Sequence, residues 1–403
     1  MLNPSLYRED TSCVSESYKK RGLEWDPFRD FIILDQKWRD ELQRLEKLKQ
    51  KRNQLLPKGK PTDEQRQKLK MLSSDIKLLQ ESVDTFEQEV KDLSLQFPNI
   101  LDEDVPFGLT EEDNVEIRRV GDIPHFDFKP KSHDELGLSH GCFDFESGTK
   151  LAGSRFSVLK QKGAQIERAL IQLMLDQHGK HHGYVEYMLP TIVNSKSLLG
   201  TGQLPKFSSD LFKLDQTDYW LSPTAEVQLT NLFRDEILNK EDLPLKLTAH
   251  TSCFRSEAGS YGKDVKGLIR QHQFNKVELV QIVEPEKSRL VLEELLQHAE
   301  SILQLLELPY RVVKLCGADT GFSSALTYDI EVWFPSENCY REISSCSNFL
   351  DFQSRRAMIR YRNKSDIKYC HTINGSGVAV GRCFAAILEN FQDQHGCIKL
   401  PKN

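Results

Sequence analysis

The chain has 403 residues, of which 38% are hydrophobic and 28% charged, and its net charge is −6. No run approaches the ~18 apolar residues of a membrane span, and the N-terminus lacks the apolar stretch of a secretory signal. The nine cysteines are scattered without a C-x-x-C pair. These features predict a soluble cytoplasmic protein with reduced thiols, and they argue against a disulfide framework or a zinc site. Binding of nucleic acid would need a local basic surface, because the molecule as a whole is acidic.

Residues 27–97 have the periodicity of a helical hairpin. In the second half, apolar residues recur at alternating steps of three and four, which is the seam of a coiled coil. This seam comprises Leu69, Leu72, Ile76, Leu79, Val83, Phe86, Val90, Leu93 and Phe97. The first half follows the same steps with Phe31, Leu34, Trp38, Leu45, Leu48 and Leu55. Pro57, Gly59 and Pro61 break the helix between the halves, so we predict an antiparallel two-helix arm.

The charges of this arm are unevenly placed. Residues 37–70 hold twelve Lys or Arg and five Asp or Glu, whereas residues 71–97 hold two basic and six acidic residues. From the charges alone, two interpretations stay open. The surface is either an ordinary solvated coiled coil or an arm that binds a polyanion by neutralising phosphates. In the second case the basic contacts would include Lys47, Lys49, Lys51 and Arg52.

From about residue 105 helical and strand-like segments mix. Residues 163–179 place apolar side chains on one helical face, and residues 183–193 alternate like a strand. Residues 263–283 and 328–334 also end in strand-like runs. Strands without regular βαβ alternation predict an α+β body with a mainly antiparallel sheet flanked by helices. We therefore divide the chain into residues 1–104, which carry the arm, and a body at 105–403.

Familiar nucleotide-binding loops are missing from this sequence. The stretch "GSGVAVG" (375–381) has the wrong glycine spacing for a dinucleotide site, and no acidic residue follows about twenty residues later. The stretch "YGKDVKG" (261–267) lacks the spacing and the Ser or Thr of a phosphate loop. Nucleotide binding therefore requires a different kind of binding site.

The stretch "CFRSEAGSYGKDVKGLIRQHQFNKVEL" (253–279) supplies one. Arg255 offers a planar fork to a phosphate or carboxylate, and Phe274 offers a face to a flat base. Arg382 adds a second cation, while Glu342 and Ser345 offer oxygen ligands that suit Mg²⁺. Each residue taken alone is most often an ordinary surface group, and the functional interpretation depends on their occurrence as an ordered set.

That ordered set resembles the bacterial-type seryl-tRNA synthetases, which are class II aminoacyl-tRNA synthetases, over nearly the whole chain. The stretch at 253–279 resembles their second class II motif, and "NGSGVAVGRCFAAILEN" (374–390) resembles the third. The helix at 163–178 and the strand ending at Pro190 resemble the first. "LSPTAEVQLTN" (221–231) and "GTGQLPKF" (200–207) are further family stretches, and the arm resembles the family's tRNA-binding arm.

The resemblance implies a role for each matching residue. Arg255 would touch the α-phosphate and the serine carboxylate, Phe274 would stack on adenine, and Arg382 would bind the far phosphates of ATP. The implied ATP site comprises Arg255, Ser256, Glu257, Gln271, Phe274, Glu342, Ile343, Ser344, Ser345 and Arg382. Glu342 and Ser345 would hold Mg²⁺. The implied serine pocket comprises Thr224, Ala225, Glu226, Glu278, Asn374 and Ser376, and the implied catalytic set is Arg255, Glu278 and Arg382.

The resemblance implies a tRNA-binding domain at 1–104 and a class II catalytic domain at 105–403. The implied activity is ATP-dependent charging of serine tRNA, and charging of selenocysteine tRNA is a further expectation. The first motif implies a homodimer, and the Thr-Ala-Glu loop argues against the zinc-dependent form of the family. Three alternatives compete with this interpretation. A carrier-protein ligase would lack the arm, a non-catalytic paralogue would have lost one of the motif residues, and a structural coiled-coil protein would not need the motifs beyond residue 150.

Overall fold

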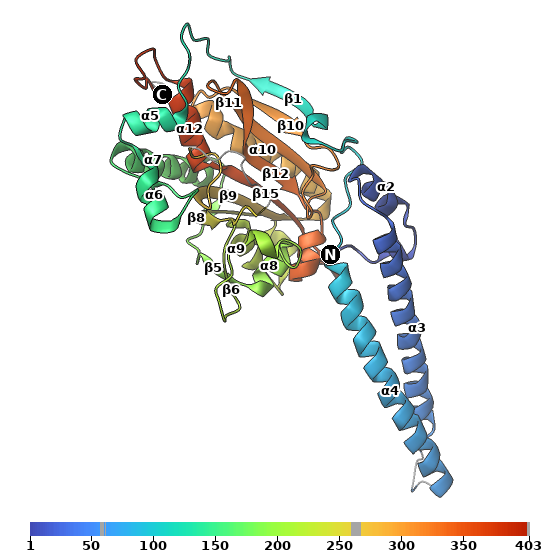
Figure 1. Ribbon diagram of the computed structural model, residues 1–403. Helices are drawn as coiled ribbons and strands as arrows, with labels where there is room; N and C mark the ends of the chain where they lie inside the picture. The colour runs from blue at the N-terminus through green and yellow to red at the C-terminus, as the bar shows by residue number, and fades with distance from the viewer. Residues whose placement is uncertain (57–59, 61, 259–266, 401–403) are drawn as a thin grey trace. The chain divides into compact units, whose positions relative to one another are not determined.

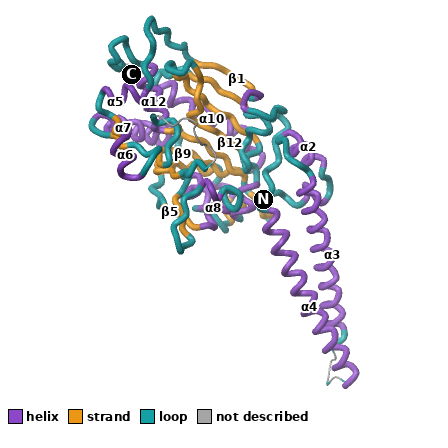
Figure 2. Tube along the Cα trace, viewed as in Figure 1, coloured by secondary structure: helices purple, strands orange, loops and turns teal. Residues whose placement is uncertain are grey.

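The computed structural model describes residues 1–56, 60, 62–258 and 267–400. The chain divides into two compact units, which are residues 1–19 with 23–98, and residues 20–22 with 99–403. The functional division after residue 104 stays a prediction, because the units are defined by packing alone. The first unit is helical and consists of α1 (Ser5–Arg8), α2 (Ser12–Lys20), α3 (Asp26–Gln54) and α4 (Asp63–Ser94). In Figure 2 these helices are purple.

Helices α3 and α4 run antiparallel, as predicted. The rings of Phe31 and Phe97 lie 5.0 Å apart at one end, and Lys49 donates to Gln80 at 2.7 Å further along. Helix α4 begins at Asp63 because Thr62 and Gln65 form a reciprocal capping box, which satisfies two free backbone donors. The helix-breaking residues Pro57, Gly59 and Pro61 lie outside the described residues.

Most of the predicted seam packs as expected. Leu45, Ile76 and Val83 are buried in one cluster, with Trp38, Leu42, Leu48 and Leu79 against it. Two predicted positions are corrected. Leu55 and Leu93 are exposed, at 38% and 40%, and Ser94 takes the buried place at the end of α4. Both exposed positions lie at a helix end, Leu55 just after α3 and Leu93 in the last turn of α4.

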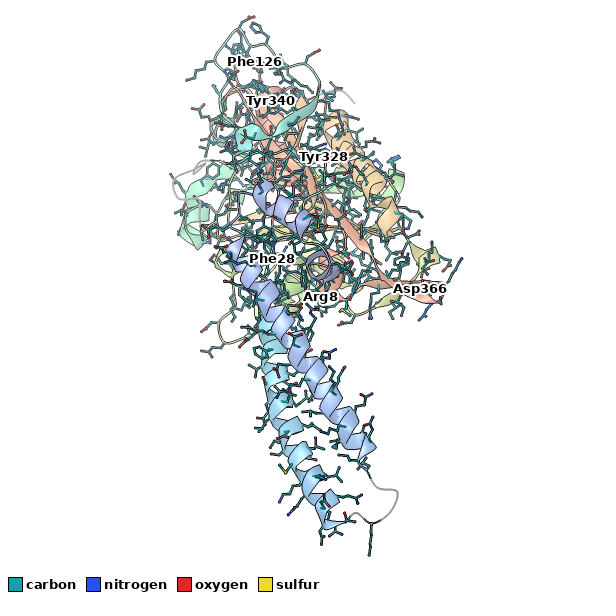
Figure 3. All side chains as sticks on the ribbon, turned by 90° about the vertical axis from the view of Figure 1, so that its right-hand side faces the viewer. Arg8, Phe28, Phe126, Tyr328, Tyr340 and Asp366 are labelled. Carbon is teal, nitrogen blue, oxygen red and sulfur yellow. The ribbon has the colours of Figure 1, made fainter. Side chains whose placement is uncertain are left out.

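Those rings form a separate cluster within the first unit. Phe28 contacts Tyr7, Tyr18, Trp25 and Phe97, with ring centroids 4.9–6.0 Å apart. Beside it, Arg8 donates to the buried carboxylate of Asp35 at 2.6 Å, and Figure 3 labels Arg8 and Phe28. The cluster holds α1 and α2 against the first turns of α3 independently of the rest of the arm.

The second unit is built on an eight-stranded sheet within the described residues, in the order β1-β10-β11-β12-β15-β9-β8-β4. Its strands are β1 (Val115–Val120), β4 (Val185–Glu186), β8 (Leu245–Phe254), β9 (Gln273–Val283), β10 (Tyr310–Lys314), β11 (Leu326–Phe334), β12 (Cys339–Asn348) and β15 (His371–Ala379). Figure 1 shows its central strands side by side. Among the described strands of this sheet, only the β4–β8 pair is parallel, which confirms the predicted antiparallel character. The smaller sheets are β2 (Phe143–Asp144) with β3 (Val158–Leu159), β5 (Ile192–Asn194) with β6 (Tyr219–Leu221), and β7 (Ile237–Asn239) with β13 (Arg360–Asn363) and β14 (Asp366–Tyr369).

Helices cover this sheet and define its two faces. They are α5 (His133–Ser139), α6 (Phe145–Ala152), α7 (Lys162–Asp176), α8 (Ser195–Thr201), α9 (Glu226–Asn231), α10 (Ser288–Leu305), α11 (Phe352–Ala357) and α12 (Val380–Asn390). Gly375 of β15 faces α10, because a Cβ atom there would stand 2.4 Å from a methyl group of Leu295. Asn374 and Ser376 therefore point to the opposite face, since neighbouring side chains alternate along a strand. That open face carries the site.

One predicted strand is corrected. Residues 183–193 do not form a single strand, but contribute β4 and the start of β5 with an extended link between them. Met188 in that link is 99% exposed, and Val185 and Ile192 are also exposed. The alternation in the sequence was real, but Pro190 removes a backbone donor and interrupts pairing.

Candidate active site

The antiparallel pair β8–β9 brings Arg255 and Phe274 together. Cys253 pairs with Phe274 across the two strands, and the backbone N–H of Arg255 donates to the carbonyl of His272 at 3.0 Å. The guanidinium of Arg255 stands 5.2 Å from the centre of the Phe274 ring. A cation and a flat ring are thus presented side by side, as the sequence predicted. The hairpin loop at 259–266 lies outside the described residues.

A cavity of about 70 Å³ lies beside this pair. Its walls come from the segment between β8 and β9 and from β9, β12, β15 and α12, several of which are far apart in the sequence. Eight of the predicted residues line it, namely Arg255, Glu257, Gln271, Phe274, Glu342, Ile343, Ser376 and Arg382. Tertiary structure therefore gathers most of the predicted ATP residues around one hollow. Arg270, which sequence analysis passed over, also lines it and pairs with Glu257 at 2.7 Å.

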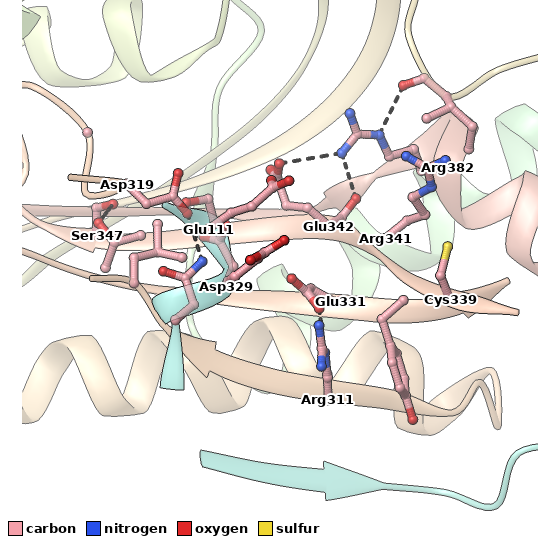
Figure 4. A pocket seen from close by; sticks show the side chains of 18 of the residues that line it. Glu111, Arg311, Asp319, Asp329, Glu331, Cys339, Arg341, Glu342, Ser347 and Arg382 are labelled. Atoms are coloured by element: carbon pink, nitrogen blue, oxygen red, sulfur yellow. Dashed lines mark hydrogen bonds and ion pairs between the residues drawn. The ribbon is translucent and has the colours of Figure 1, made fainter. Parts of the chain in front are cut away.

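Arg382 is held in place by backbone carbonyls. It lies in the first turn of α12, where its Nε donates to the carbonyl of Ile269 at 3.1 Å. One terminal nitrogen donates to the carbonyl of Glu342 at 2.6 Å and stands 3.6 Å from the Glu342 carboxylate, as Figure 4 shows. The guanidinium is thus oriented in advance, while neutral carbonyls leave most of its charge available for an anion.

A bulge in β12 puts Glu342 and Ser345 on the same face. These residues are three apart, so a regular strand would point them to opposite faces. In the structure Ser344 pairs with Ile330 and Glu342 pairs with Glu331, which leaves Ile343 as the extra residue. Ser345 consequently faces Asp329 across the sheet, and Glu342 faces Glu331 on the same side. The bulge therefore allows the two predicted oxygen ligands, Glu342 and Ser345, to lie on one face of the sheet.

Asp329 is a site residue that the sequence analysis missed. Its Oδ1 is buried and has no hydrogen-bond partner within the described residues. Burial and the negative charge of Glu342 raise the pKa of Asp329 well above its usual value. A buried carboxylate with an unused oxygen, beside a glutamate and a hydroxyl, fits a divalent cation, which would neutralise the repulsion. The only signal in the sequence was its place in the strand "YDIEVWF".

These groups border a larger hollow of about 660 Å³, shown in Figure 4. Acidic and basic side chains line it together. The acidic ones are Glu111, Glu112, Asp319, Asp329, Glu331 and Glu342, and the basic ones are Arg270, Arg311, Arg341 and Arg382. Mixed charge of this kind suits a polyphosphate that arrives with a metal ion, because the arginines take phosphate oxygens and the carboxylates take the ion.

A second group of predicted residues meets on the same face of β9 and β15. Ser376 pairs directly with Glu278, and Asn374 pairs with Val280. Glu278 is almost fully buried, and the Nζ of Lys276 lies 2.5 Å from its Oε2. Sequence analysis missed Lys276, although its spacing of two from Glu278 places both side chains on one face of a strand.

The Thr-Ala-Glu loop leads into α9 next to this group. The Oγ1 of Thr224 accepts the backbone N–H of Glu226 at 3.3 Å, and Ala225 is fully buried. Burial, followed by the charge of Glu278, raises the pKa of Glu226 to about 7, and the charges of Lys276 and Arg255 act against that shift. Thr224, Glu226, Glu278 and Asn374 are all buried.

Two predicted ATP residues have hydrogen-bond partners within the protein. The hydroxyl of Ser256 donates to the carbonyl of Ser209 at 2.5 Å. The hydroxyl of Ser344 donates to the carbonyl of Ser376 at 2.6 Å, because the bulge turns it away from the metal-facing side. Each hydroxyl can still accept a hydrogen bond, and the contact of both residues with ATP stays a prediction.

The predicted basic residues of the arm all belong to α3. Lys47 and Lys51 are exposed, whereas Lys49 and Arg52 are half-buried.

No three His, Cys, Asp or Glu side chains in the described parts of the chain group so that they could hold a metal ion by themselves. Among the described helices, none has the length and apolar character needed to cross a membrane.

Comparison with known proteins agrees with this arrangement. A family model described as "Seryl-tRNA synthetase N-terminal domain" matches residues 1–101, and one described as "tRNA synthetase class II core domain (G, H, P, S and T)" matches residues 211–391. A serine–tRNA ligase of Carboxydothermus hydrogenoformans is 50% identical over 411 aligned positions, which cover 100% of this chain and 97% of that protein. The chain belongs to the seryl-tRNA synthetase family.

Solved structures of seryl-tRNA synthetases have the same fold. The enzyme of Pyrococcus horikoshii, crystallised with ATP, superimposes with a TM-score of 0.95 at 34% identity and covers 100% of this chain and 97% of that one. The enzyme of Naegleria fowleri, in complex with AMP, gives a TM-score of 0.90 at 29% identity, with 100% and 96% covered. Because the match includes the arm, the carrier-protein ligase is set aside, and because it includes the class II core, the purely structural coiled coil is set aside as well.

Proposed function

We propose that this seryl-tRNA synthetase activates L-serine with ATP and transfers it to the 3′ end of serine tRNA in the cytoplasm. The observation that carries the proposal is the single cavity lined by Arg255, Phe274, Ser376 and Arg382, within a chain that belongs to this family over its whole length. Pyrophosphate exchange measured with each of the twenty amino acids tests it. Serine alone should support rapid exchange.

ATP would bind across the two hollows. Phe274 stacks on the adenine ring, Arg255 takes the α-phosphate, and Arg382 takes the far phosphates from its carbonyl-bound position. Mg²⁺ would be held by Glu342, Ser345 and Asp329, and when bound it neutralises phosphate charge. The unused Oδ1 of Asp329 supports this assignment.

Serine activation requires positioning and charge stabilisation, with no covalent intermediate on the protein. The serine carboxylate attacks the α-phosphorus in line, giving seryl-adenylate and pyrophosphate. Arg255 compensates the negative charge that shifts during attack. A ribose hydroxyl at the 3′ end of the tRNA then attacks the acyl carbon, which releases AMP.

The serine pocket would discriminate by hydrogen bonding and by volume. Glu226 and Glu278 accept the ammonium group, while Thr224, Asn374 and Ser376 surround the short side chain. A site that binds a substrate hydroxyl rejects the analogue that lacks it by roughly 10⁴-fold, because its buried polar groups would stay unpaired. Alanine is thereby rejected, and the small space excludes threonine.

Replacing Glu278 with glutamine is expected to lower serine-dependent exchange at least about tenfold. The change keeps the shape of the side chain and removes one charge-assisted hydrogen bond, worth ~1.5–3 kcal/mol. Steady-state exchange at several serine concentrations gives kcat and KM. Glu286→Gln serves as a matched control, because Glu286 is exposed shortly after the same strand. Unchanged exchange in Glu278→Gln would show that the pocket is assigned wrongly.

The KM for serine is expected to rise about tenfold as the pH falls from 8 to 6. The pKa of Glu226 is raised to about 7, so below pH 7 its carboxyl group keeps a proton that an ammonium ion must displace. Above pH 7 the carboxylate is free to accept serine. Glu226→Gln should show a high KM that depends little on pH in this range. A wild-type KM that is flat from pH 6 to 8 would contradict the assignment of Glu226.

We also propose that the chain acts as a homodimer through α7 and the segment that follows it. Val185, Met188 and Ile192 are exposed apolar side chains that a two-fold contact would cover. Sedimentation at micromolar concentration should give twice the chain mass of 46.5 kDa. Met188→Asp should shift the equilibrium toward monomer, whereas the same change at Met71, an exposed methionine of α4, should not. A wild-type monomer would count against the interface.

In the first unit, the basic part of α3 would contact the tRNA backbone, so that residues 1–104 recognise the tRNA and residues 105–403 catalyse both steps. Charging of selenocysteine tRNA by the same route is part of the proposal, and it would be tested by adding that tRNA to the same assay.

A further inference from the structure

Gln353 lies beside the proposed serine pocket, and it belongs to neither the second nor the third class II motif. It lies in α11 and is 1% exposed, so its amide is fully removed from water. Its Nε2 donates to the Oε1 of Glu226 at 2.6 Å and to the backbone carbonyl of Thr201 at 3.2 Å. Its Oε1 accepts the hydroxyl of Thr372 at 2.6 Å. One side chain thus joins the Thr-Ala-Glu loop, the end of α8 and strand β15.

These partners define the orientation of the amide. The nitrogen faces two acceptors, a carboxylate and a carbonyl, and the oxygen faces a hydroxyl that can donate. Turning the amide over would place its oxygen against Glu226 and the Thr201 carbonyl, leaving two pairs of acceptors in contact. Both hydrogens of Nε2 are therefore committed, one of them to Glu226.

Glu226 needs such a donor because of the charges around it. Glu278 on β9 opposes its ionisation, and Lys276 on β9 and Arg255 after β8 favour it, but burial is the largest influence and disfavours the charged form. Gln353 favours the carboxylate without bringing a charge of its own. A cation in its place would compete with the substrate's ammonium group, whereas an amide stabilises the acceptor and leaves it unneutralised.

We propose that Gln353 is a positioning residue for serine recognition, holding the Glu226 carboxylate in place for the ammonium group of the substrate. The inference rests on the proposed function of Glu226, and it adds that serine affinity depends on the contact between α11 and the Thr-Ala-Glu loop. Gln353 touches neither ATP nor serine in this account, so it acts only through Glu226.

The test is Gln353→Met, which keeps the length of the side chain and removes the donor. We expect the KM for serine to rise about tenfold, with kcat and the KM for ATP within about twofold of wild type. The pH below which the serine KM rises should move upward, because the carboxylate loses a stabilising hydrogen bond. An unchanged serine KM, or an equal rise in the KM for ATP, would overturn the proposal, since a general structural defect affects both substrates.

A double-mutant cycle separates this proposal from the assignment of Glu226. In a Glu226→Gln background, Gln353→Met should cause no further rise in the serine KM, because the carboxylate it serves is gone. If the two substitutions together raise the serine KM by the product of their separate effects, the proposed role of Gln353 is overturned. If Glu226→Gln alone leaves serine binding unchanged, the proposed function of the pocket fails instead.

Thr372→Val gives an independent readout if Gln353→Met does not fold. It keeps Gln353 and its size is nearly unchanged, but it removes the hydroxyl that orients the amide. We expect a rise of a few-fold in the KM for serine alone. A serine KM equal to that of wild type in a folded Thr372→Val variant would overturn the proposal, because the amide would then not depend on its anchor.

Discussion

Replacing residues 37–90 with a short flexible linker is expected to lower transfer of serine to tRNA at least about a hundredfold, while serine-dependent pyrophosphate exchange stays within a few-fold of the intact enzyme. The cavities that carry Arg255, Arg382 and Glu342 are lined only by residues of the second unit. The basic part of α3 belongs to the first unit. Losing several Lys and Arg contacts to phosphate removes most of the electrostatic affinity. Proteins with about 6–10 such contacts lose roughly 10³–10⁵-fold in affinity between 50 and 200 mM salt, which indicates how large this contribution is.

In the structure, residues 37–90 can be removed without dividing either apolar cluster of the first unit. The apolar cluster of the arm, centred on Leu45, Ile76 and Val83, lies entirely inside the removed segment. The aromatic cluster around Phe28 and Phe97 lies entirely outside it. The shortened protein should therefore keep its remaining fold. Thermal unfolding of the variant checks this, and an armless protein that charges subsaturating tRNA at the intact rate would refute the role of the arm.

A milder variant separates charge from shape. Changing Lys47, Lys49, Lys51 and Arg52 to glutamine keeps good helix formers, so the arm should fold while affinity for tRNA and its salt dependence both fall. Lys77→Gln with Lys91→Gln is the matched control, because these lysines lie in the acidic second helix. Equal losses in both variants would show that the basic part of α3 has no special role.

Changing Arg255 to glutamine is expected to lower pyrophosphate exchange by about 10²–10³-fold, mostly in kcat. Among the described residues, Arg255 makes one weak side-chain hydrogen bond, 3.4 Å long, to the carbonyl of Pro223, and its guanidinium lies over Phe274. Its charge is thus available for the phosphorus centre, and removal of one such donor from a transition state costs ~2.7–4 kcal/mol.

Arg362→Gln is the matched control for this measurement. Arg362 is an exposed arginine in β13, which belongs to the small three-stranded sheet and lines neither cavity. It should exchange at the wild-type rate. A rise in the KM for ATP at unchanged kcat in Arg255→Gln would mean that Arg255 binds the ground state equally well and does not assist the attack.

Part of the fold was evident from the sequence for a simple reason. In the arm, each of the two long helices packs against the other. Apolar residues at steps of three and four therefore mark the side chains that lie in this contact. The pattern failed only at Leu55 and Leu93, which lie at helix ends and are exposed. The prediction of one strand at 183–193 was wrong for a related reason. Alternation of polar and apolar residues shows that the two sides of a segment face different surroundings, but it does not show whether the segment pairs with another strand along its whole length.

The candidate site was foreseeable only as a set of residue types in order. Arg255, Phe274 and Glu278 could be placed on one hairpin face by counting along strands, and the resemblance to a family supplied the rest. Asp329, Lys276 and Gln353 were missed because each is an ordinary residue by itself. Their importance comes from a buried oxygen without a partner, a close contact with Glu278, and an amide joining three segments.

By itself, the sequence determined the arm, the antiparallel body and the chemical groups available for binding a nucleotide and an amino acid, because these follow from periodicity and side-chain type. Only the tertiary structure decided how those groups face one another. Glu342 and Ser345 share a face because β12 carries an extra residue at Ile343, and Glu226 is held by an amide more than a hundred residues away. Both facts depend on the register of strands and the packing of distant segments. Such contacts are formed by the whole sheet and its helices, and no local stretch of sequence encodes them.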